Sequence, residues 1–247
     1  MDWKRDCAAV IPCLNQAREI GEVVERTRAL AGRVIVVDDG STDGTAAAAR
    51  AAGAETVRHA CNRGKGAALR TGWRRALAEG CSWVVTLDGD GQHAPEDIPA
   101  FWKRAEAGGA RLVAGNRMHE ARAMPWARRA VNRWMTGRIS SLAGFALADS
   151  QCGLRLMHIE SLEALGTRSQ RFEIESEVLA GFVRKGWRVD FVPVRVIYAR
   201  GGTSRIRPVA DGARWLRWWL RARDAARERE HGVASISVEE NAAGFVR

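Results

Sequence analysis

The sequence has no segment that would carry the chain into or through a membrane. Residues 1–6 are charged and lack the apolar core of a secretory signal. No run approaches the roughly 20 apolar residues that a membrane-spanning helix needs. We therefore expect a cytoplasmic protein that is either soluble or peripheral on the inner face of the cell membrane.

Paired cysteines are missing as well. The five cysteines are an odd number, they are scattered along the chain, and none forms a C-x-x-C pair. This pattern argues against a disulfide framework and against a structural zinc site. It is typical of a protein in a reducing cytosol.

Motifs for nucleic-acid binding are absent despite a strongly basic composition. The formal net charge of +10 points to nucleic acid, an anionic membrane surface or phosphorylated substrates as partners. No RNA-recognition or helix-turn-helix signature accompanies this charge, and the loop at 62–66 lacks the spacing of a Walker motif. We therefore predict no nucleic-acid partner and favour the other two.

The sequence does contain β-branched runs that alternate with helical periodicity as far as residue 117. Short apolar runs bounded by turn residues predict buried strands, and this alternation predicts an α/β fold: a mostly parallel sheet with helices on both faces. The predicted strands cover residues 8–11, 34–37, 55–58, 83–87, 111–114 and 189–196. The predicted helices cover 20–31, a segment ending at 52, 67–79, a segment beginning at 95, 126–142, 172–185 and 210–229.

Residues that bind ligands recur directly after these strands. Asp38 and Asp39 follow the second strand, Asp88 and Asp90 the fourth, and Arg117 the fifth. The carboxyl ends of parallel strands share the edge at which open α/β sheets bind ligands. Structural carboxylates have no reason to recur at one edge, so we expect a site there, although Asp38 alternatively caps its turn.

Asp88 and Asp90 are separated by one glycine, a spacing that suits a cation. Two hard oxygen ligands this close repel each other unless a cation lies between them, and Mg²⁺ or Mn²⁺ with substrate phosphates is the usual occupant. Gly89 allows the backbone to approach a ligand closely. The alternative is an Asx-rich turn after a core strand.

A series of short motifs stands in a fixed order along the chain, beginning with residues 10–15, 37–45, 62–66 and 87–93. Together they resemble the family-2 glycosyltransferases with the Rossmann-like GT-A fold. Later motifs narrow the resemblance to the dolichol-phosphate mannosyltransferase-like branch, and they lie at 115–117, 151–155, 172–175 and 203–205. The resemblance covers roughly residues 8–206 and implies a catalytic domain at residues 1–207.

The resemblance implies a nucleotide-diphosphate sugar as donor. Pro12, Asn15, Glu19 and Asp39 would line the nucleoside pocket, with Asp39 near the base. Lys65, which lies between two glycines, would pair with the aspartates or with phosphate. A solvated loop lysine is the alternative for Lys65.

The resemblance also implies a divalent metal, Mg²⁺ or Mn²⁺, held with the diphosphate by Asp88, Asp90 and Gln92. Asp88 and Asp90 would thereby take part in catalysis. The family more often has alanine at the position of Gly89, and we expect the missing methyl to be tolerated. We expect His93 to be a surface or satisfied core residue and not a metal ligand.

Acceptor-side roles fall to arginines and to one acid. Arg117, Arg129 and Arg205 match positions at which the family contacts the acceptor phosphate and the leaving group. Glu175 matches an acid near the family's active site. Arg128 is expected to be solvated or to face a membrane.

These assignments predict an inverting transfer of a hexose to a polyprenyl phosphate of the dolichyl or undecaprenyl type. A metal neutralises the leaving diphosphate, and an acceptor oxygen that is already anionic needs orienting arginines rather than a strong base. Two alternatives stay open. One is the same donor with a glycan, lipid or pathway intermediate as acceptor, and the other is a non-catalytic nucleotide-sugar or membrane-binding module.

Residues 208–230 form a predicted amphipathic helix that carries tryptophans among arginines, followed by a tail at 231–247. Tryptophan with arginine suits the headgroup region of an anionic membrane. The helix alternatively packs on its own domain or forms a homodimer seam. Family members often carry transmembrane helices, so a membrane-anchor partner is a further alternative.

Overall fold

The computed structural model describes residues 1–119, 124–197 and 210–226. The chain divides into two compact units, Met1–Arg205 and Ile206–Arg247. In the second unit residues 210–226 are helical, so the predicted terminal helix is present over its described part. Arg205 and the predicted tail lie outside the described residues, and the predicted domain boundaries stay predictions. No helix within the described ranges is long and apolar enough to cross a bilayer.

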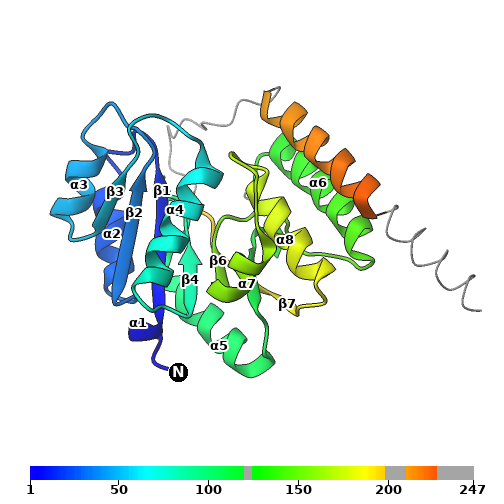
Figure 1. Cartoon of the computed structure of the whole chain (residues 1–247), viewed down its shortest axis with the longest axis horizontal. Helices are drawn as coiled ribbons and strands as arrows, with labels where there is room; N and C mark the ends of the chain where they lie inside the picture. The colour runs from blue at the N-terminus through cyan, green and yellow to red at the C-terminus, as the bar shows by residue number, and fades with distance from the viewer. Residues whose placement is uncertain (120–123, 198–209, 227–247) are drawn as a thin grey trace, which may run out of the picture. The chain divides into compact units, whose positions relative to one another are not determined.

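The first unit is built on one mixed sheet (Figure 1). In the described residues its strands are β1 (Cys7–Cys13), β2 (Arg33–Asp38), β3 (Glu55–Arg58), β4 (Trp83–Thr86), β5 (Leu112–Asn116), β6 (Arg155–His158) and β7 (Val189–Pro193). They lie side by side in the order β3-β2-β1-β4-β6-β5-β7. β6 runs antiparallel to β4 and β5, whereas the other pairs are parallel. The predicted mostly parallel α/β sheet is therefore confirmed.

Helices cover both faces of this sheet, as predicted (Figure 1). Ala9 and Ile11 of β1 belong to a core cluster that includes residues of α2 (Ile20–Arg28), α3 (Thr45–Ala51) and α5 (Ile98–Gly108). Val10 points to the other face because side chains alternate along a strand. There it packs against α4 (Lys65–Ala78) at Gly72, where a Cβ would overlap the Val10 side chain. The other helices are α1 (Trp3–Asp6), η1 (Pro95–Asp97), α6 (Trp126–Ala143), α7 (Ile159–Leu165) and α8 (Ile174–Arg184).

Several element boundaries differ from the sequence prediction. β1 continues through Pro12, which we expected to close it. The Leu87 N–H donates to the Val10 carbonyl at 3.3 Å, so the backbone N–H and C=O groups of even-numbered residues in β1 point toward β4. The pairing of β1 with β4 ends at Val10 and Thr86, before Pro12. The missing N–H of Pro12 therefore costs no sheet bond. β7 ends at Pro193 rather than at residue 196, and the sequence pattern does not predict β6, α1 or α7.

Strand direction brings the candidate residues to one edge of the sheet. The parallel strands β1, β2, β4 and β5 all end there, as the sequence argument requires. β6 begins at the same edge, since Arg155 pairs with both Thr86 and Ala114. The segment at 149–154 therefore reaches the ends of β4 and β5 directly.

Candidate active site

The loop after β4 carries Asp88 and Asp90. Asp88 lines a small cavity together with Lys65 and Glu175, and its side chain is 30% exposed. The backbone N–H of Gln92 donates to Asp90 Oδ1 at 3.0 Å, which is the geometry of an Asx turn. Asp90 is therefore held by its own turn, whereas Asp88 faces a cavity with other charged groups.

Lys65 is the first residue of α4 and joins two acids. Its Nζ lies 2.6 Å from Asp88 Oδ1 and 2.6 Å from Glu175 Oε1. Burial disfavours the charged lysine, but the two carboxylates outweigh this effect and raise the pKa of Lys65 above its usual value. The alternative of a solvated lysine is wrong, because the side chain is 13% exposed and doubly paired.

Close backbone packing explains the glycines on either side of Lys65. A Cβ at Gly66 would overlap the Ser169 carbonyl, and a Cβ at Gly64 would overlap the Gln170 carbonyl. Gly64 also has a φ of +98°, which other residues rarely adopt. The segment before α8 thus packs on the start of α4 and positions Lys65 between the acids.

The surroundings of the two aspartates move their pKa values in opposite directions. Burial would raise the pKa of Asp88, but Lys65 and His93 outweigh it, and the pKa falls well below its usual range. Burial and the negative charge of Asp88 raise the pKa of Asp90. Asp88 therefore stays ionised and has a positively charged partner within the protein. A cation added beside Asp90 would relieve the repulsion between the two carboxylates.

His93 is a core residue beside Asp88, but it is not the satisfied one that we expected, and its exclusion as a metal ligand stays a prediction. It is 4% exposed, and its Nε2 is 3.5 Å from Asp88 Oδ2. Its Nδ1 is buried and has no hydrogen-bond partner within the described chain. Gly153 leaves space beside the same carboxylate, because a Cβ there would lie 2.8 Å from Asp88 Oδ2. The available signal was the position of His93, three residues after Asp90 in the sequence.

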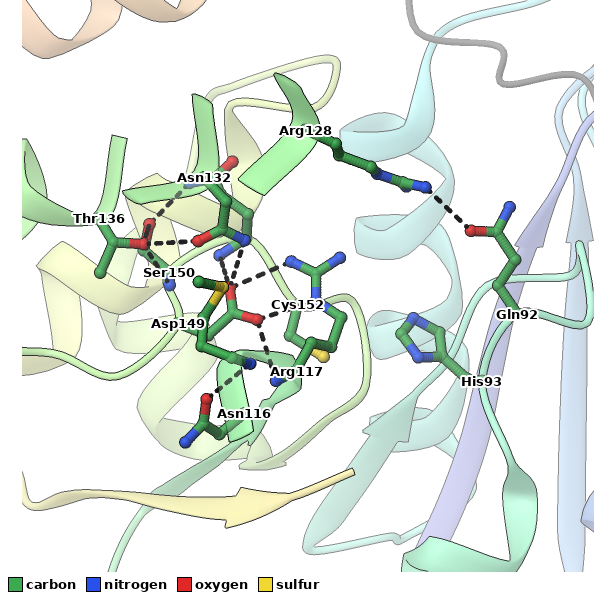
Figure 2. Close-up of polar contacts among 12 residues, drawn as sticks. Gln92, His93, Asn116, Arg117, Arg128, Asn132, Thr136, Asp149, Ser150 and Cys152 are labelled. Atoms are coloured by element: carbon green, nitrogen blue, oxygen red, sulfur yellow. Dashed lines mark hydrogen bonds and ion pairs between the residues drawn. The ribbon is translucent and has the colours of Figure 1, made fainter. Parts of the chain in front are cut away.

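Arg117 is anchored by a buried acid that the sequence argument did not single out (Figure 2). Its Nε and Nη2 donate to the two carboxylate oxygens of Asp149 at 2.8 and 3.1 Å, and Asn132 of α6 donates to the same carboxylate at 3.0 Å. Burial would raise the pKa of Asp149, but Arg117 holds it below its usual value. Asp149 therefore fixes Arg117 between the end of β5 and α6.

A contact from α6 reaches the loop of the two aspartates, as Figure 2 shows. Arg128 Nη1 donates to Gln92 Oε1 at 3.3 Å. Arg128 is half-buried and contacts this loop, a role beyond the solvated or membrane-facing one that we expected, and its membrane contact stays a prediction. Arg129, the next residue, is half-buried and also has an interaction partner.

Asp39 is buried, and its carboxylate is used within the protein. Arg63 N–H donates to Oδ1 at 2.9 Å and Gly64 N–H donates to Oδ2 at 2.7 Å, while His59 Nδ1 lies 2.7 Å from Oδ1. Asp39 thus ties the end of β2 to the loop that leads to Lys65. Its contact with a nucleoside base stays a prediction.

Asn15 joins the loops that follow β1 and β2. It has a φ of +50°, a left-handed conformation that asparagine tolerates. Its N–H donates to Ser41 Oγ and its Oδ1 accepts from Thr42 N–H, both at 2.7 Å. Of the other residues expected near the nucleoside, Pro12 lines the small cavity, and Glu19 is exposed before α2.

The space that an alanine would fill at Gly89 is taken by Cys13. A Cβ at residue 89 would overlap Cys13 Sγ, and Cys13 is 3% exposed at the end of β1. The Cys13 sulfur, at the end of the neighbouring strand β1, therefore fills the space that the methyl group of an alanine at residue 89 would need.

The residues present suit a cation that arrives with a diphosphate. Asp88 and Asp90 offer two carboxylates, and Lys65 offers a positive charge for phosphate oxygens. No three His, Cys, Asp or Glu side chains converge on one point in the part of the chain that the structure describes. A divalent cation held here would therefore take further ligands from phosphate and water, as Mg²⁺ commonly does.

The fold is that of the GT-A glycosyltransferases. The crystal structure of glucosyl-3-phosphoglycerate synthase from Mycobacterium tuberculosis superposes with a TM-score of 0.64 and 25% identity, covering 81% of this chain and 74% of that one. A complex of that enzyme with phosphoglyceric acid gives a TM-score of 0.68 at 23% identity, covering 90% and 80%.

Sequence comparison then identifies the family. The model for glycosyl transferase family 2 matches residues 8–166, and the chain belongs to this family. It is 31% identical over 215 residues to polyprenol monophosphomannose synthase of Mycolicibacterium smegmatis, covering 80% of this chain and 79% of the relative. It is 29% identical over 219 residues to UDP-N-acetylglucosamine–dolichyl-phosphate N-acetylglucosaminyltransferase of Methanococcus voltae, covering 79% and 87%. An uncharacterised protein of Methanocaldococcus jannaschii is 32% identical over 219 residues, covering 86% and 90%.

Proposed function

We propose that this glycosyltransferase is inverting and metal-dependent, and that it moves a hexose from a nucleotide-diphosphate sugar to a polyprenyl phosphate. The observation that carries the proposal is the charged cluster at the sheet edge, where Lys65 lies 2.6 Å from both Asp88 and Glu175. Such a cluster beside a second acid, Asp90, suits a diphosphate and its cation. Positioning and electrostatics then supply most of the catalysis.

Asp88, Asp90 and Gln92 would hold Mg²⁺ or Mn²⁺ with the diphosphate. When bound, the cation would neutralise charge that develops on the leaving nucleotide. Lys65 would stabilise the same phosphates, and Glu175 would keep Lys65 in position. Pro12, Asn15, Glu19 and Asp39 would contact the nucleoside, either directly or by shaping its pocket.

The acceptor assignment is supported by the relatives, two of which are named for transfer to polyprenol or dolichyl phosphate. An anionic phosphate oxygen attacks without a strong base, so arginines that orient it suffice. Arg117, Arg129 and Arg205 are our candidates for that role. A single displacement would invert the anomeric carbon, and an inner-face membrane location would give access to a lipid acceptor.

Transfer assays test this proposal. Purified protein would be incubated with UDP- and GDP-sugars, Mn²⁺ or Mg²⁺ and undecaprenyl or dolichyl phosphate, with products identified by mass spectrometry. Asp90→Asn should lower turnover on the order of 10²–10³-fold, the loss seen when one stabilising group leaves other active sites. Glu25→Gln, an exposed acid on α2, should not. Absence of any transfer, with unchanged nucleotide affinity in Asp90→Asn, would refute the proposal.

A different acceptor is the second candidate, and the assay can separate the two. The structural likeness at 25% identity to glucosyl-3-phosphoglycerate synthase supports a small phosphorylated acid as a comparison substrate. Transfer to 3-phosphoglycerate but not to polyprenyl phosphate would show that the proposed lipid acceptor is wrong and that the proposed donor chemistry stands. Nucleotide-sugar binding without transfer to any acceptor would instead favour a binding module.

A further inference from the structure

Two of the three proposed metal ligands already interact with cationic side chains of the protein. Lys65 Nζ lies 2.6 Å from Asp88 Oδ1, and Arg128 Nη1 donates to Gln92 Oε1 at 3.3 Å (Figure 2). The two cations come from different elements, since Lys65 begins α4 and Arg128 lies in the first turns of α6. They thus approach the aspartate loop with the same sign of charge that a metal would bring.

A divalent cation that enters this site alone meets two unfavourable terms. It must compete with Lys65 for Asp88, and its charge is repelled by the ammonium and by the guanidinium. Lys65 cannot relax into water, because its side chain is 13% exposed. Both side chains therefore weaken the binding of the cation when no diphosphate is present.

A nucleoside diphosphate reverses this balance. Its phosphate oxygens are better partners for an ammonium and a guanidinium than an amide oxygen or a shared carboxylate is. Lys65 keeps Glu175 as a second partner at 2.6 Å, so it can release Asp88 without losing every counter-charge. Arg128 can likewise leave Gln92, because this contact is a single hydrogen bond.

We propose that Lys65 and Arg128 are internal counter-ions that couple metal binding to diphosphate binding, so that the cation binds tightly only together with the nucleotide. This inference rests on the proposed function, because it assumes that Asp88, Asp90 and Gln92 hold the metal. Coupling between two ligands is reciprocal, so metal must tighten diphosphate binding by the same factor.

Mn²⁺ binding, followed by loss of the electron paramagnetic resonance signal of free Mn²⁺, tests the coupling without any turnover. Affinity would be measured for Mn²⁺ alone and with UDP or GDP, after correction for Mn²⁺ held by free nucleotide. The wild-type chain should bind Mn²⁺ weakly alone and about 5–150-fold more tightly with diphosphate, the usual range of such coupling. Lys65→Met and Arg128→Met should each tighten the binding of Mn²⁺ alone several-fold and reduce the coupling factor.

Matched variants separate this effect from a general change in charge. Arg133→Met removes an exposed arginine from the same helix and should leave both Mn²⁺ affinities unchanged. Lys65→Arg and Arg128→Lys keep the charge and should retain much of the coupling. If Lys65→Met does not fold, Arg128→Met carries the test alone, because Arg128 is half-buried and makes one contact to the loop.

The outcomes distinguish the inference from the function on which it rests. If Mn²⁺ binds the wild-type chain equally well with and without diphosphate, or if Arg128→Met behaves like Arg133→Met, the counter-ion proposal is wrong and the metal site stands. If Mn²⁺ binds neither alone nor with UDP or GDP, the metal site and the counter-ion proposal fall together.

Discussion

Cys13 and Gly89 share one volume between the end of β1 and the loop after β4. A methyl group at residue 89 would overlap the buried Cys13 sulfur, and overpacking of this kind costs about 1–3 kcal/mol. Gly89→Ala should therefore lower the free energy of unfolding by that amount, as measured by urea denaturation. Because the loop holds Asp88 and Asp90, transfer activity should fall as well.

A double-mutant cycle checks that the sulfur is the cause. Cys13→Ala removes it, and Cys13→Ala combined with Gly89→Ala should recover most of the stability that Gly89→Ala loses. Additive losses in the double variant would contradict the shared volume.

Asp90 should destabilise the metal-free fold when it is ionised. Burial and the charge of Asp88 raise its native pKa above its usual value, which is about 3.9 in an unfolded chain. A carboxyl group with a raised native pKa binds its proton more tightly in the folded state. Its contribution to stability is therefore present below the unfolded pKa and is lost as the pH rises through the native pKa. In EDTA at pH 7, Asp90→Asn should raise the melting temperature.

The pH dependence of that gain is the decisive measurement. The difference between Asp90→Asn and the wild-type chain should shrink as the pH falls below about 4, where both states of the wild-type carboxyl become protonated. A gain of the same size at every pH would show that the raised pKa is not its source.

At the residue scale, the sequence predicted the acids of the site better than their partners. Asp88, Asp90 and Lys65 stand in local motifs, and strand ends place such motifs at one edge. Arg117 and Asp149 are instead 32 residues apart, and Arg128 and Gln92 are 36 apart. Pairs of this separation depend on how helices pack, which local periodicity does not encode.

At the scale of elements, Asp149 holds α6 to the end of β5. It is fully buried and pairs with Arg117 at 2.8 Å, so Asp149→Asn would leave a buried guanidinium without its counter-charge. Removing one partner of a buried ion pair costs about 3–5 kcal/mol. We expect a loss of that size in the free energy of unfolding, measured by urea denaturation.

The exposed pair of Arg26 and Glu96 provides a matched control. The two side chains are 2.9 Å apart and are 30% and 46% exposed, and the hydrogen bond from Arg26 lowers the pKa of Glu96 to about 2. Because water screens such pairs, Glu96→Gln should cost at most about 1 kcal/mol. Equal losses in Asp149→Asn and Glu96→Gln would contradict a special role for Asp149.

Elements with a long or unbroken pattern were predicted, and short or mixed ones were not. The strand at 33–38 is an almost unbroken buried run, and the helices α4 and α8 bury a series of small and apolar residues. β6 was missed because only two apolar residues lie between Arg155 and His158. The buried Arg155 guanidinium is satisfied by the carbonyls of Ser150, Cys152 and Glu175, which the apolar pattern does not reveal. α1 and α7 have four and seven residues, too few to show a period.

At the scale of the whole molecule, the net charge of +10 suits an anionic lipid surface. Arg217 and Arg221 lie one turn apart and exposed on the terminal helix. Each basic residue near such a surface contributes about 1 kcal/mol. In the full chain, Arg217→Glu with Arg221→Glu should weaken binding to phosphatidylglycerol vesicles by at least about 30-fold in a sedimentation assay.

Charge reversal elsewhere separates a local surface from total charge. Arg50→Glu with Arg74→Glu changes two exposed arginines on α3 and α4 by the same amount. This control should weaken binding to phosphatidylglycerol vesicles much less, and neither double variant should differ from the wild-type chain with neutral phosphatidylcholine vesicles. If both double variants lose affinity equally, the terminal helix is not the membrane-facing element.

The reversed direction of β6 has a consequence for how the enzyme can be remodelled. Because β6 starts beside the ends of β4 and β5, the connection after Gly144, which is exposed at 144–146, leads straight to that neighbourhood. Residues inserted there would lengthen the exposed connection that leads to Asp149, the ion-pair partner of Arg117, and leave the crossovers between co-directional strands intact. If Arg117 orients the acceptor as proposed, lengthening this one surface connection would change acceptor preference and leave the donor side as it is.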